Sequence, residues 1–218
     1  ETHDQLFVYI PSRDALMPGD NFYYSFPNLY TIRGTSPRPV DEWIGSLDHM
    51  RRLDPDVLVP SHTAPVMGRD HIREVLSAYR DGIQWVRDEV ARGANDLVPI
   101  ETLANRIKLA PELAELPQLQ ELYGQIDWSV RAIYTNSLGW FDARTHRLYP
   151  PDDVQAREVE LMGGADAVLS TARGALSDGD PRWAAHLMGK LMDAGLRTED
   201  DLKEDLITAY RAVGQAVE

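Results

Sequence analysis

A change of sequence texture near residue 70 constrains the fold of this chain more than any other feature. Residues 1–70 are rich in proline, glycine and aromatic side chains, and their apolar runs are short. From residue 71 onward, apolar side chains recur every three or four positions, as they do along one face of a helix. The sequence therefore predicts an α/β region at residues 1–70, followed by an all-α region at residues 71–218.

The first region alternates strand and helix patterns. Short apolar runs that end at a proline predict strands at residues 6–10, 15–17 and 57–59, the first of them buried. Residues 40–53 repeat apolar side chains at helical spacing, and the Asp54-Pro55 pair ends that predicted helix. The order strand–helix–strand is typical of an α/β layer.

The second region is predicted to form helices at residues 71–93, 102–109, 117–141, 154–176, 181–194 and 198–217. Leu122 and Tyr123 are among the predicted core residues of the third helix. Asp180 is expected to cap the fifth helix, whose first turn contains Pro181, and acidic residues follow Thr198 at the start of the sixth. We expect the last two helices to pack as a hairpin.

The composition excludes some classes of function. The 218 residues include 22 lysines and arginines against 35 aspartates and glutamates, and the resulting net charge of -13 would repel a nucleic-acid backbone. No apolar run approaches the roughly 20 residues that cross a bilayer. No cysteine is present for disulfides or thiolate metal sites. The chain begins at Glu1, without a methionine or a signal peptide, so we expect a piece or processed form of a longer protein, in a compartment left open.

Two candidate metal ligands directly follow predicted strands. Asp20 comes after the strand at residues 15–17, and His62 after the strand at residues 57–59. Because the ends of neighbouring strands meet at one edge of a sheet, these side chains are expected to converge. Carboxylate oxygen and imidazole nitrogen both suit zinc. An ordinary charged surface with a capped loop remains an alternative for these residues alone.

Three short motifs around these residues resemble the second half of a metallo-β-lactamase fold. They are Glu1-Thr-His-Asp-Gln-Leu-Phe-Val-Tyr-Ile-Pro11, Pro18-Gly-Asp20 and Pro60-Ser-His62. The resemblance implies an αββα sandwich, present here in part, with three metal ligands: Glu1, the bridging carboxylate Asp20, and His62. Glutamate instead of histidine at the first ligand position is typical of the alkyl sulfatase branch.

Two further stretches resemble alkyl sulfatases. Asn28-Leu-Tyr-Thr-Ile-Arg-Gly34 is similar to their sulfate-holding loop, which implies that Asn28 and Arg33 bind sulfate oxygens. A guanidinium fork and an amide donor match a tetrahedral oxyanion. Trp128-Ser-Val-Arg-Ala-Ile-Tyr134, followed by Leu-Gly-Trp-Phe-Asp at residues 138–142, resembles their helical dimerisation domain. The domains implied are therefore residues 1–70, the end of the metallo-β-lactamase-like domain, and residues 71–218, the dimerisation domain.

The chain also departs from that family pattern. Many primary alkyl sulfatases have glutamate at the position of Asp20, and histidine at the positions of Pro27 and Trp128. The His-x-His-x-Asp-His loop that supplies four further ligands does not occur in this sequence. Three ligands divided between two metals do not hold a dinuclear site, so we expect this chain alone to be inactive.

The resemblance implies a function for the intact enzyme. Two zinc ions would lower the pKa of a water near Asp20, and Arg33 with Asn28 would hold the sulfate while an alkyl sulfate is hydrolysed to an alcohol and inorganic sulfate. The helical region would pair two subunits into a homodimer. Two alternatives stay open: another hydrolase of the superfamily, acting on a lactone, thioester or phosphoester, and a non-catalytic helical dimerisation module.

Overall fold

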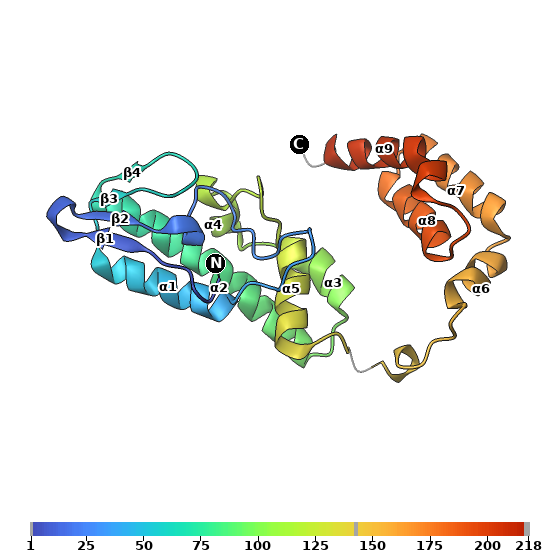
Figure 1. Ribbon diagram of the computed structural model, residues 1–218, viewed down its shortest axis with the longest axis horizontal. Coiled ribbons are helices and arrows are strands. Elements are labelled where there is room, and N and C mark those ends of the chain that lie inside the picture. The colour runs from blue at the N-terminus through green and yellow to red at the C-terminus, as the bar shows by residue number, and fades with distance from the viewer. Residues whose placement is uncertain (1, 142–143, 216–218) are drawn as a thin grey trace. The chain divides into compact units, whose positions relative to one another are not determined.

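The computed structural model describes residues 2–141 and 144–215, without the side chains of His146 and Gln215 (Figure 1). Its packing divides the chain into two compact units, Glu1–Ala143 and Arg144–Glu218. Four strands and nine α-helices lie within the described residues, and every strand belongs to the first unit. An α/β region followed by helices is therefore confirmed as the fold class.

A small mixed sheet forms the start of the first unit. Its strands are β1 (Val8–Ile10), β2 (Ala15–Met17), β3 (Val57–Leu58) and β4 (Val66–Met67), hydrogen-bonded in that order. The β2–β3 pair is parallel, and the two outer pairs are antiparallel. The three predicted strands are present, and β4 is a fourth strand that was not predicted from the sequence. The prediction of a buried first strand is wrong, because β1 is an edge strand and its Val8 is 53% exposed.

Two helices cover the sheet. Helix α1 (Val40–Leu53) has the predicted bounds, and α2 (Arg69–Asn95) begins slightly earlier than expected. Strands β3 and β4 pack on α2, and α1 lies beside α2 (Figure 1). The apolar face of each helix joins Leu16 and Leu58 of the sheet in one core. Trp43 is fully buried there, and its indole N–H donates to the backbone oxygen of Asn21 at 2.8 Å.

Two chain reversals at one end of this layer share a single cation. Asp14 follows the 3-10 turn Pro11–Arg13 and Asp54 follows α1, and both have left-handed backbones, with φ of 47° and 51°. The guanidinium of Arg69 donates to the carboxylates of both aspartates. The Tyr9 hydroxyl also donates to Asp14, at 2.6 Å. These carboxylates therefore fix conformations that a residue with a Cβ rarely adopts.

The first unit ends in three shorter helices: α3 (Ile100–Arg106), α4 (Pro111–Ala114) and α5 (Ile126–Leu138). The prediction of one helix over residues 117–141 is wrong. A 3-10 turn at Pro117–Leu119 is followed by non-helical chain, and α5 starts only at Ile126. The non-helical segment packs against another loop, since a Cβ on Gly124 would lie 2.3 Å from the backbone oxygen of Pro27. Tertiary packing therefore overrides the helical pattern here.

The second unit is a small helical assembly of α6 (Val154–Leu161), α7 (Ala165–Ser177), α8 (Pro181–Asp193) and α9 (Glu199–Gln215), after the 3-10 turn Thr145–Arg147. Asp180 caps α8 as predicted, accepting from the Trp183 backbone N–H at 3.1 Å. Thr198 and Asp201 exchange hydrogen bonds at the start of α9. Helices α8 and α9 pack together as the expected hairpin.

The boundary expected between residues 70 and 71 does not coincide with a boundary in packing. Helix α2 spans that position and packs on the sheet, on α1 and on α5, so the first unit extends to residue 143. Which domain family each segment belongs to stays a prediction. None of the described helices combines the length and the apolar character that crossing a membrane would demand.

Candidate functional site

The parallel pairing of β2 and β3 brings the two predicted metal ligands together. Asp20 lies on the 3-10 turn Gly19–Asn21 after β2, and His62 lies on the loop after β3. The backbone N–H of Ser61 donates to the oxygen of Gly19 at 3.4 Å, which holds the two chain segments side by side. The Nδ1 atom of His62 lies 2.9 Å from Oδ1 of Asp20. The expected convergence at one sheet edge is therefore present.

This pair has the donor chemistry of a zinc site but is not a complete one. The carboxylate oxygen and the imidazole nitrogen lie at the distance of a hydrogen bond or ion pair, and both are atom types that bind zinc. Glu1, the third predicted ligand, lies outside the described residues. Within residues 2–141 and 144–215, no group of three or more histidine, aspartate or glutamate side chains could hold a metal ion. Zinc sites need at least three protein ligands, so the described residues would supply part of one.

Asp20 and His62 open into a cavity of about 640 Å³. Arg33 and Arg38 line the same cavity as the carboxylate–imidazole pair. Arg38 lies over the Trp43 ring, 5.9 Å from its centroid, and donates to the Thr31 hydroxyl at 3.3 Å. With Arg33 and Arg38 among its lining residues, the cavity can bind an anion. It is also lined by Tyr23, Tyr24, Ser25, Thr63, Leu122 and Tyr123.

The structure does not place Asn28 beside Arg33 on this wall. Asn28 is only 3% exposed, and it is not among the residues that line the cavity. Its backbone N–H donates to the Tyr23 hydroxyl at 2.6 Å, and its side-chain oxygen is buried without a hydrogen-bond partner. Sulfate binding by Asn28 stays a prediction, and the visible contact of this residue is with a cavity wall residue.

A buried phenol lies behind the cavity. The ring of Tyr79 packs at 6.3 Å from the ring of Tyr23 and at 4.9 Å from that of Phe22. Burial raises the pKa of the Tyr79 hydroxyl well above its ordinary value, and the nearby Tyr23 and Asp20 raise it further. Tyr79 therefore stays protonated and neutral at any physiological pH, and it supports the wall without supplying charge.

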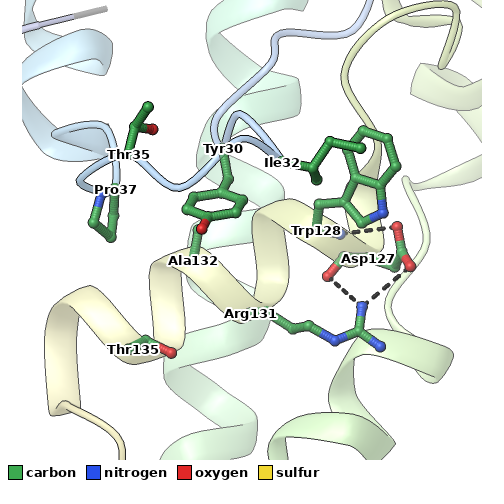
Figure 2. A pocket seen from close by; sticks show the side chains of 9 residues that line it. All are labelled: Tyr30, Ile32, Thr35, Pro37, Asp127, Trp128, Arg131, Ala132 and Thr135. Atoms are coloured by element: carbon green, nitrogen blue, oxygen red, sulfur yellow. Dashed lines mark hydrogen bonds and ion pairs between the residues drawn. The ribbon is translucent and has the colours of Figure 1, made fainter. Parts of the chain in front are cut away.

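A second cavity, of about 650 Å³, is lined by other residues of the loop at residues 21–39, which also contains Arg33 (Figure 2). Ile32 and Trp128 line it together. Its one arginine, Arg131, donates to the carboxylates of Asp127 and Glu101, and the hydrogen bond that it donates to Glu101 is the main cause that raises the Arg131 pKa. The arginine of this second cavity is therefore already paired with two carboxylates. Trp128 thus lines the second cavity and not the one at Asp20.

Some residues of the Asp20 cavity were not identified from the sequence. Arg38 and Tyr23 carry no motif, and their proximity to the site results from how the loop at residues 21–39 folds. Leu122 and Tyr123 were predicted as helix core, and that prediction is wrong: they are 79% and 58% exposed. His3, from the motif at the start of the chain, pairs with Glu42 at 2.7 Å and is not among the residues that line this cavity.

Comparison with known proteins is consistent with this geometry. Residues 100–218 match the alkyl sulfatase dimerisation family. A linear primary-alkylsulfatase from Pseudomonas sp. is 37% identical over 99% of this chain, and an (R)-specific secondary-alkylsulfatase from Pseudomonas sp. is 32% identical over 92% of it. The solved structure of a stereoselective inverting sec-alkylsulfatase from Pseudomonas sp. superimposes with a TM-score of 0.87, at 32% identity over 95% of the chain.

The chain therefore belongs to the alkyl sulfatase dimerisation family, within the alkyl sulfatases of the metallo-β-lactamase superfamily. It spans 42% of the length of the primary-alkylsulfatase, 31% of the secondary-alkylsulfatase and 34% of the solved chain. The resemblance stated from the motifs is thereby confirmed. Membership in the family supports sulfate ester hydrolysis and self-association at the level of the family.

Proposed function

We propose that this chain is part of a zinc-dependent hydrolase that cleaves alkyl sulfate esters to an alcohol and inorganic sulfate. The observation that carries the proposal is the Asp20–His62 pair, 2.9 Å apart, opening into a cavity lined by two arginines. Asp20 and His62, together with Glu1, are the zinc ligands in this proposal. Because the described residues give only part of a metal site, the 218-residue chain alone is inactive.

The arginines bind the ester in this proposal. Arg33 and Arg38 hold the sulfate oxygens and offset the negative charge that grows on them as the ester bond breaks. Zinc, when bound, makes water nucleophilic near neutral pH. Water adds a hydroxyl group to one side of the broken ester bond and a proton to the other, releasing the alcohol and hydrogen sulfate. Asn28 binds a sulfate oxygen in this proposal. Its backbone N–H also donates to the Tyr23 hydroxyl, which holds the loop at residues 21–39 in place.

Two arginines on one cavity favour a tetrahedral anion over a neutral lactone or thioester. A guanidinium group binds the charged oxygens of such an anion more strongly than the uncharged oxygen of a lactone or thioester. The family match over residues 100–218 supports homodimer formation through the helical region. A helical dimerisation module without catalysis is the second candidate, and the same match favours it.

Zinc content and sulfate release test the proposal. In the longest natural form of the protein, His62→Ala should lower the zinc content from two ions per subunit towards one and should lower sulfate release by more than about 100-fold, because even residues that merely orient metal ligands contribute 10- to 100-fold to affinity or activity. His71→Ala removes an exposed histidine of α2 outside the cavity and should change neither. Zinc would be measured by elemental analysis, and sulfate release with dodecyl sulfate.

Each other outcome has a distinct meaning. Full zinc content and full turnover in His62→Ala would refute the metal assignment. Two zinc ions per subunit without sulfate release would keep the metal centre and point to a different ester. A natural form with neither zinc nor sulfate release, but with the mass of a dimer, would favour the dimerisation module.

A further inference from the structure

Two exposed apolar side chains form part of the wall of the Asp20 cavity. Leu122 is 79% exposed and Tyr123 is 58% exposed, yet both line the cavity that holds Asp20, His62 and Arg33. Large apolar side chains in water are common singly, but here two adjacent ones border a charged site. The cavity is thus polar where the arginines lie and apolar at Leu122 and Tyr123.

The backbone that carries these side chains is held firmly in place. The Gln120 oxygen accepts from the Phe26 backbone N–H at 2.8 Å and from the Ser25 hydroxyl at 3.0 Å. On the other side, Gly124 lies against the backbone of Pro27, where no side chain would fit. Leu122 and Tyr123 therefore sit on a short segment fixed at both ends to the loop that leads to Arg33.

A ring contact and a second loop complete this arrangement. The Tyr123 ring meets that of Tyr23 edge to face, with centroids 6.1 Å apart. The Tyr24 backbone N–H donates to the Thr63 hydroxyl at 3.1 Å, beside His62. The apolar wall, the arginine loop and the histidine loop are thus joined through neighbouring residues. A fixed apolar surface at the border of an anion site suits a ligand that is charged at one end and aliphatic at the other.

We infer that Leu122, with Tyr123 beside it, binds the aliphatic chain of the ester and sets the preference of the site for chain length. The inference rests on the proposed function, because it takes Arg33 and Arg38 as the groups that bind the charged end. Each methylene that the wall buries should strengthen binding by about fourfold at most. A hydroxyl in place of the leucine side chain removes that gain for long chains and leaves short ones unaffected.

Calorimetric binding of alkyl sulfonates from ethyl to octyl tests the inference, because these anions keep the charged end and cannot be hydrolysed as esters. The longest natural form of the protein should bind octyl sulfonate far more tightly than ethyl sulfonate. Leu122→Ser should weaken octyl sulfonate by about tenfold and change ethyl sulfonate by less than twofold. Leu122→Phe should keep the dependence on chain length. Leu161→Ser is the matched control, since this leucine of α6 is 88% exposed and lies outside the cavity.

The outcomes separate this inference from the proposed function. If ethyl sulfonate binds and Leu122→Ser leaves the dependence on chain length intact, the wall does not bind the chain and the inference fails alone. If no sulfonate and no inorganic sulfate binds, and Arg33→Ala behaves as the natural protein, the anion site itself fails. If Leu122→Ser halves the mass in sedimentation while octyl binding is unchanged, the wall is a contact between two copies, which also overturns the inference.

Discussion

The two units of this chain are stabilised by different kinds of core. The first buries large aromatic side chains, among them Trp43, Tyr79 and Phe22. The core of the second, over its described residues, consists of alanine, leucine, valine and methionine, and its Trp183 and Tyr210 are exposed. Large aromatic side chains bury much apolar surface each, whereas small side chains let helices pack closely. The loops that form the cavity belong to the first unit, the one with the aromatic core.

The family match does not follow this division. It covers residues 100–218 and so includes α3 to α5 of the first unit as well as the whole second unit. Leu122 and Tyr123, on the cavity wall, lie in the matched stretch. A segment named for dimerisation thus contributes directly to the candidate site. If packing rather than family membership decides what a residue affects, a substitution should change the stability and binding of its own unit and leave the other unit unchanged.

The largest effect is expected from truncating an aromatic core residue. Trp43→Ala should destabilise the first unit by about 3–5 kcal/mol, because it leaves a cavity and deprives the Asn21 oxygen of its hydrogen bond. Leu191→Ala should cost the second unit about 2–5 kcal/mol. Hydrogen exchange followed by mass spectrometry would report each unit separately. Loss of protection in α8 caused by Trp43→Ala would mean that the two units unfold together.

A smaller effect is expected where the matched stretch meets the arginine loop. Gly124→Ala would bring a Cβ to 2.3 Å from the Pro27 oxygen, which should cost about 1–3 kcal/mol and weaken binding of inorganic sulfate. Gly189→Ala, in α8, is the control, because a Cβ there meets nothing within 4 Å and alanine favours a helix. Thermal unfolding and calorimetry would measure both. An unchanged sulfate affinity in Gly124→Ala would show that the loop adapts without consequence.

The smallest effect expected is a loss of folding stability at low pH. The hydrogen bond from Tyr9, then that from Arg69, lowers the Asp14 pKa below its ordinary value of 3.8, and Arg73 does the same for Asp54. The unfolded chain therefore takes up protons first as the pH falls, so this stabilisation is complete above pH 3.8 and is lost below it. Melting curves between pH 6 and pH 3 should show the loss, reduced in Asp54→Asn. An identical loss in that variant would exclude Asp54 as a source.

Much of the fold was accessible from the sequence. Helix α1 has its predicted bounds because its apolar spacing is regular and Asp54-Pro55 ends it. The convergence of Asp20 and His62 followed from their places after two strands. The segment at residues 120–125 was not predictable, because its helical spacing is overridden by contacts with residues 25–28, about a hundred positions away. Arg38 enters the site through the fold of its own loop, where it donates to Thr31 and lies over the ring of Trp43.

The shared cation at the two chain reversals has a consequence for how this sequence can vary. Arg69 binds the carboxylates of Asp14 and Asp54, and each of those aspartates holds a left-handed backbone. Losing the arginine leaves each carboxylate with one remaining partner, Tyr9 for Asp14 and Arg73 for Asp54. Among descendants of this sequence, the three positions should therefore be inherited as a set, with glycine the most tolerable replacement for either aspartate.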